Sequence, residues 1–167
     1  MDEQIKKRLH RVAEEILEKL AFMFSFPEDE GGEINYDAVV AASVSFAGPF
    51  SGNLIMVVSE QILPELTGNM LGLDDKDETT LEQRHDALKE LINVICGNLL
   101  PTIAGKHSIF NVNAPVILPG GTNFSSDDGN KPVSAVRLSI EDEPCNILLF
   151  VKDGLSPEMI VAESEAE

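Results

Sequence analysis

Residues 85–98 read HDALKELINVICGN and predict a helix with two unlike faces. At 3.6 residues per turn, one side of this helix is apolar and would face a protein core. Its members are Leu81, Leu88, Leu91, Ile92, Ile95 and Leu99. Asp86, Glu90, Asn93 and Gly97 follow at spacings of four, three and four residues and lie almost opposite. From the residues alone, this polar stripe is either a solvated helix face or a surface that meets a partner.

The ends of this helix are marked by familiar signals. Thr79 or Thr80 can cap the first turn, and we expect Glu82 to complete a capping box. Gly105 is expected to stop the helix just after Ala104.

The other segments predict a mixture of helices and antiparallel strands. An amphipathic helix is expected over 2–24, with Asp2 as its N-cap, and a shorter helix capped by Ser59 should end at Gly72. Alternating or apolar runs predict two hairpins and one edge strand that Pro115 interrupts. The expected strands cover 36–46, 53–58, 108–118, 133–140 and 146–152.

A weak internal repeat accompanies this pattern. Residues 42–59 resemble residues 135–152, with Asn53 matching Asn146, and a long amphipathic helix precedes each hairpin. The predicted fold class is therefore α+β, an antiparallel sheet covered by long helices and built from pseudo-duplicated helix–hairpin units.

Composition narrows the possible partners. The chain of 167 residues carries a net charge of −17, which argues against binding nucleic acid or anionic lipid. We find no signal peptide and no apolar run long enough to span a membrane, so we expect a cytoplasmic protein. Cys96 and Cys145 suggest buried thiols in a reducing compartment. The three histidines show no spacing typical of a metal site.

The length suits one domain, which we place at residues 1–153. Residues 154–167 are acidic and weakly apolar, and we expect them to form a loose tail.

The stripe, followed by Gly97-Asn98 and Pro115, resembles the signature of the CheC/CheX/FliY chemotaxis phosphatases. The predicted order of elements is also similar to that family up to about residue 153, closest to CheX because only one helix carries the signature. One departure is that 21 residues, one fewer than usual, separate Asn93 from Pro115.

The resemblance implies a phosphatase that removes the phosphoryl group from the phospho-aspartate of a CheY-like response-regulator receiver. It implies that Asn93 orients the attacking water and that Glu90 docks the receiver lysine. Asp86 and Gly97 would be binding residues at the rim. The protein would need no metal or cofactor of its own, because the receiver would supply Mg²⁺.

A second hypothesis of another class remains open. A protein of this fold can bind a receiver without hydrolysing anything, or act as a dimerising scaffold. The presence of both Glu90 and Asn93 favours the enzyme. Since CheX relatives pair through sheet edges, we also expect a homodimer.

Overall fold

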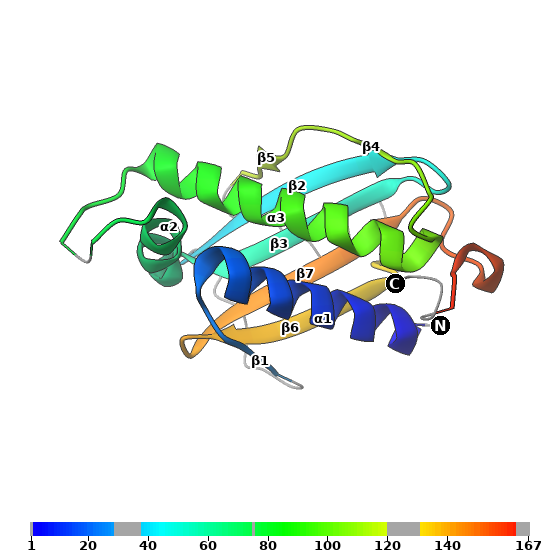
Figure 1. The fold of residues 1–167 in the computed structure, drawn as a ribbon, viewed down its shortest axis with the longest axis horizontal. Helices are drawn as coiled ribbons and strands as arrows, with labels where there is room; N and C mark the ends of the chain where they lie inside the picture. Colours follow the sequence, from blue (N-terminus) through cyan, green and yellow to red (C-terminus); the bar gives the residue numbers. More distant parts are fainter. Residues whose placement is uncertain (1, 29–37, 75, 120–130, 163–167) are drawn as a thin grey trace.

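The computed structural model describes residues 2–28, 38–74, 76–119 and 131–162 (Figure 1). Long helices cover one face of a single antiparallel sheet. In chain order, the elements are α1 Asp2–Ala21, β1 Ser25–Pro27, β2 Val39–Ala47, β3 Gly52–Ser59, the 3₁₀ turn η2 Glu60–Ile62, α2 Leu63–Leu71, α3 Leu81–Ala104, β4 Asn111–Val112, β5 Val116–Ile117, β6 Ser134–Ile140, β7 Glu143–Val151 and the 3₁₀ turn η4 Pro157–Met159. The predicted α+β class is confirmed.

The sheet has the strand order β1-β6-β7-β3-β2-β4, and β5 also pairs with β2. The two hairpins meet along the β3–β7 ladder at its centre, while β1 forms one edge and the short strands β4 and β5 form the other. Pro115 lies between β4 and β5, which explains why the predicted strand over 108–118 is two short pieces at an edge.

The register of the central ladder supports the internal repeat. Asn53 pairs with Phe150, and Val57 pairs with Asn146. In the repeat, Asn53 corresponds to Asn146 and Val57 corresponds to Phe150. The two pairs therefore exchange under the repeat, as a pseudo-twofold axis through the β3–β7 ladder requires.

The core lies between the sheet and the layer of α1 and α3. Alternate residues of the four long strands point toward the helices and are buried there. Ala41, Ile55 and Val57 form a smaller buried cluster on the opposite face. The fully buried side chains contributed by the strands include Ala42, Val44, Leu54, Met56, Val58, Leu138, Ile140, Cys145, Ile147 and Leu149.

Helix α3 is apolar enough to raise the question of a membrane. Within the described part of the chain it is the one helix whose length and composition would allow a span, but half of the relevant window is buried inside the fold. A core helix has the same composition, and the contacts of α3 with α1, α2 and the sheet show that it has this role.

The first helix ends earlier than predicted. It stops at Ala21, and Phe22 adopts a positive φ of 51° that turns the chain toward β1. Met23 is buried after this turn, whereas Phe24 is 66% exposed. The apolar periodicity through Phe24 was misleading because the last apolar residues belong to the turn and strand. Asp2 is already in the first helical turn, so the prediction that it is the N-cap is wrong.

The start of the expected tail makes contacts with the fold. Leu155 is buried, and the Val161 amide donates a hydrogen bond to the Ile103 carbonyl at 2.8 Å. The buried Arg8 guanidinium donates to the carbonyls of Thr102 and Val161. Residues 154–162 are therefore held against α1 and α3, while 163–167 lie outside the described residues. The domain boundary at residue 153 stays a prediction.

We expect Gly52→Ala to lower the free energy of unfolding by about 2 to 4 kcal/mol. A methyl group at Gly52 would collide with the backbone carbonyl of Phe150 across the β3–β7 ladder. Urea denaturation monitored by circular dichroism measures the change. The control is Gly68→Ala in α2, where an added methyl meets nothing within 4 Å and should leave stability equal or slightly higher. Equal stability of the two variants would contradict this account of the ladder.

Candidate active site

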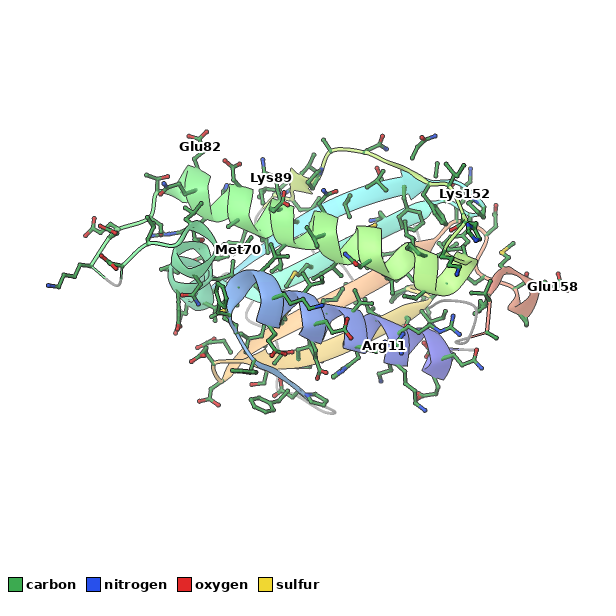
Figure 2. All side chains as sticks on the ribbon, in the orientation of Figure 1. Arg11, Met70, Glu82, Lys89, Lys152 and Glu158 are labelled. Atoms are coloured by element: carbon green, nitrogen blue, oxygen red, sulfur yellow. The ribbon has the colours of Figure 1, made fainter. Side chains whose placement is uncertain are left out.

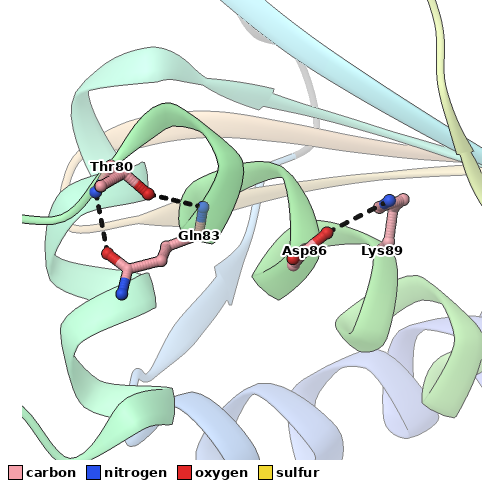
Figure 3. A network of polar contacts seen from close by, with 4 residues as sticks. All are labelled: Thr80, Gln83, Asp86 and Lys89. Atoms are coloured by element: carbon pink, nitrogen blue, oxygen red, sulfur yellow. Dashed lines mark hydrogen bonds and ion pairs between the residues drawn. The ribbon is translucent and has the colours of Figure 1, made fainter.

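Helix α3 begins with a complete capping box (Figure 3). The Thr80 hydroxyl accepts a hydrogen bond from the Gln83 amide at 3.1 Å, and the Gln83 side chain accepts one from the Thr80 amide at 2.8 Å. The predicted cap is thus Thr80, but its partner is Gln83 and not Glu82, because the reciprocal bond requires the third helical position. The box fixes where the helix starts and hence which residues face outward.

The inner face of α3 matches the prediction with one exception. Leu88, Leu91, Ile92, Ile95 and Leu99 are fully buried against the sheet and α1. Leu81 is 63% exposed, so its prediction as a core residue is wrong. It is the first residue of the helix, and it borders an open groove beside β5.

The four residues of the predicted stripe lie on the outer side of α3. Asp86, Glu90 and Gly97 are exposed, and Asn93 is partly buried. Glu90 and Asn93 are three residues apart in a helix, so their side chains are neighbours with Cβ atoms about 5–6 Å apart. Within the ranges that the structure describes, neither side chain has a hydrogen bond or ion pair. A carboxylate and an amide are therefore available together to a molecule approaching this face.

Asp86 is already engaged. Its carboxylate lies 3.2 Å from the Lys89 ammonium and forms an ion pair with this residue, three positions further along the helix (Figure 3). The pair is solvent-accessible, so it contributes at most about 1 kcal/mol to stability. The sequence contains the signal for this pair, because opposite charges three residues apart on a helix attract each other. The contact makes Asp86 better suited to the rim of a site than to chemistry.

Gly97 has no packing role that explains it. A methyl group added there would meet nothing within 4 Å, so the fold does not require a glycine. Glycine in the middle of an exposed helix instead destabilises it by about 1 kcal/mol relative to alanine. A bare backbone at this point lets another molecule approach α3 closely.

The described residues offer no obvious nucleophile near the stripe. Cys96 and Cys145 are buried, and this burial raises the pKa of each thiol to about 12. Both thiols are therefore protonated at neutral pH and are poor nucleophiles. The described ranges also contain no group of three His, Cys, Asp or Glu side chains placed to hold a metal ion. The chemistry that the stripe supports is positioning by hydrogen bonds.

Comparisons with known proteins give a consistent picture. The family model for chemotaxis phosphatase CheX matches residues 40–137. No curated protein matches the sequence significantly. Among solved structures, CheX from Desulfovibrio desulfuricans has a TM-score of 0.71 at 18% identity, over 89% of this chain and 99% of that one. CheX from Vibrio vulnificus has 0.70 at 16%, over 89% and 97%.

A third similar structure is a complex. CheX from Borrelia burgdorferi, in a crystal structure with CheY, BeF₃ and Mg²⁺, has a TM-score of 0.65 at 19% identity, over 87% of this chain and 96% of that one. At these identities the structural likeness establishes the fold.

We expect Gly97→Ala to raise the free energy of unfolding by about 1 kcal/mol, because the open site accepts the methyl group and alanine favours the helix. Gly105→Ala on the same helix is the control and should lower it, since Gly105 has a φ of +100° that alanine rarely adopts. Chemical denaturation of both variants gives the sign of each change in the free energy of unfolding. A loss of stability in Gly97→Ala would show that the glycine serves the fold.

Proposed function

Because this chain belongs to the CheX family of chemotaxis phosphatases, we propose that it hydrolyses the phospho-aspartate of a CheY-like receiver domain, with Asn93 and Glu90 as its working residues. The observation that carries the proposal is the outer face of α3. An amide and a carboxylate stand side by side there, without partners among the described residues, on a helix whose other face is fixed in the core. The Borrelia CheX structure with CheY supports a receiver as the partner.

Asn93 would act on water. An acyl phosphate is already reactive, so catalysis needs mainly an attacking water held in line with the bond that breaks. The Asn93 amide can donate and accept hydrogen bonds without titrating, which suits it to orient that water. The water oxygen then bonds to phosphorus, and the bond from phosphorus to the aspartyl oxygen breaks. The products are inorganic phosphate and a free aspartate.

Glu90 would fix the docking geometry. Its exposed carboxylate can form a charge-assisted hydrogen bond with the lysine of the receiver active site. One turn of helix separates Glu90 from Asn93, so this bond would set the distance from the amide to the phosphoryl group.

Asp86 and Gly97 would bound the contact on either side. Asp86, held by Lys89, is a rim residue that orients polar groups of the receiver. Gly97 leaves the helix backbone bare where the receiver approaches.

This protein would bring no cofactor of its own to the reaction. Mg²⁺ would arrive bound to the receiver and would offset negative charge on the phosphoryl group. We also propose that the protein works in the cytoplasm, where receivers are phosphorylated.

We expect Asn93→Ala to abolish the acceleration of phosphate loss from a phosphorylated receiver of the same cell, lowering the rate at saturation about 100-fold or more. Glu90→Ala should mainly raise KM, by about 10- to 100-fold, because it removes a charge-assisted bond used in docking. Loss of ³²P from the labelled receiver measures both effects.

The matched controls for this experiment are Gln61→Ala on η2, which removes an exposed amide, and Glu65→Ala on α2. Both residues are exposed and lie off the stripe, and neither change should alter the kinetics. If receivers bind but none loses phosphate faster, the catalytic proposal fails, and the protein is a receiver-binding or scaffold module.

We further propose a homodimer that forms through the β1 edge of the sheet. Phe22, Phe24 and Phe26 are all exposed around this edge, and such a group of large apolar side chains is unusual on a monomer surface. Sedimentation should give a dimer mass for the wild type and a monomer mass for Phe26→Asp. If the Phe26→Asp variant stays dimeric, the dimer interface does not lie at the β1 edge.

A further inference from the structure

A groove lies next to the stripe, between the first half of α3 and the edge strand β5. Figure 1 shows β5 running alongside this part of the helix. The groove has a volume of about 510 Å³ and is open to solvent. Its lining residues are Leu81, Glu82, His85, Asp86 and Lys89 from α3, and Pro115, Val116 and Ile117 from the strand side. The proposed contact with the receiver includes Asp86 at its rim and Lys89, which holds Asp86.

The groove combines exposed apolar side chains with a charged border. Leu81 is 63% exposed and Val116 is 54% exposed, and they stand in opposite walls with Pro115 beside them. Large apolar side chains that gather in a hollow, rimmed by polar groups, are typical of a protein-binding surface. Neither residue stabilises the core, so the fold alone does not explain them.

The polar rim connects the groove to the stripe. Asp86 belongs to both, and its ion pair with Lys89 forms their shared border. Figure 2 shows Glu82 and Lys89 on the same exposed side of α3. Asp86 lies one turn before Glu90 on the same face of α3, so a partner that reaches Glu90 and Asn93 also meets the border of the groove.

The area that a specific interface needs also indicates that a partner bound to the stripe covers the groove. A stable protein–protein contact buries about 1,200 to 2,000 Å² in total. A stripe of four residues, one of them glycine, provides little of this area and almost no apolar surface. The adjoining groove provides both.

We propose that this groove binds an apolar side chain from the receiver surface beside its phospho-aspartate, and that Leu81 and Val116 determine which receivers are accepted. The inference rests on the proposed function. Because Asn93 does not line the groove, contacts made in the groove are the same before and during the reaction. Such contacts change KM and leave the rate at saturation unaltered.

The test compares Leu81→Asp and Val116→Asp with wild type on the phosphorylated receiver, across a range of receiver concentrations. Each variant should raise KM about tenfold or more, with kcat within twofold of wild type. Leu81→Ala and Val116→Thr should give smaller increases in the same direction, which guards against a folding defect at β5. Circular dichroism and thermal melts establish that each variant is folded.

The control variants place the same charge at exposed apolar positions outside the groove. Leu71 at the end of α2 is 51% exposed and Ile109 is 81% exposed, so Leu71→Asp and Ile109→Asp should leave KM unchanged. Binding of the unphosphorylated receiver, measured by calorimetry, should weaken in the groove variants alone.

With an active wild type, three results would overturn the inference. KM values equal to those of the controls would show that the receiver does not enter the groove. A fall in kcat at constant KM would show that the groove residues act in the chemical step and not in binding. A change in sedimentation mass without a change in KM would show that the groove binds a second copy of this chain. A wild type that accelerates phosphate loss from no receiver shows failure of the proposed function itself, and the inference falls with it.

Discussion

The burial of one face of α3 is the constraint on which the rest of the structure depends. Five aliphatic side chains of this helix are fully removed from water against the sheet and α1. Rotating the helix to hide Glu90 or Asn93 would expose that surface, at about 1.5 to 3 kcal/mol for each side chain. The hydrophobic effect therefore holds the polar stripe outward, and the capping box at Thr80 fixes its position along the helix axis.

This arrangement suits a protein that assists a reaction on a partner. The stripe offers an amide and a carboxylate at fixed spacing, and the neighbouring groove offers apolar surface at the same border. Positioning groups need a rigid support, which a core helix provides better than a loop. The bare backbone at Gly97 lowers helix stability, and such a loss is expected where function and stability compete.

Local chemistry explains which sequence predictions succeed. The hairpins, the Thr80 cap and the end of α3 at Gly105 all follow from signals within a few residues. Ser59 is a cap as predicted, but it caps the 3₁₀ turn η2, and α2 begins only at Leu63. The errors at Asp2 and Glu82 are shifts of one residue at a helix end. The errors at Phe24 and Leu81 occur where a residue's role depends on distant parts of the chain. Phe24 continues the helical periodicity, but the chain must turn at Phe22 for β1 to reach β6. Leu81 has the correct spacing for the core, but it lies in the first turn of α3, where it is 63% exposed beside an open groove.

The sequence by itself determined the α+β class, the internal repeat and the outward direction of Asp86, Glu90, Asn93 and Gly97, because periodicity and caps are local properties of the chain. Only the tertiary structure decided that Gly97 faces open space and that Val116 lies across a groove from Leu81. β5 joins the sheet through β2, a strand more than seventy residues earlier in the chain. No local pattern encodes such a pairing, because burial and hydrogen bonding across the whole sheet select it.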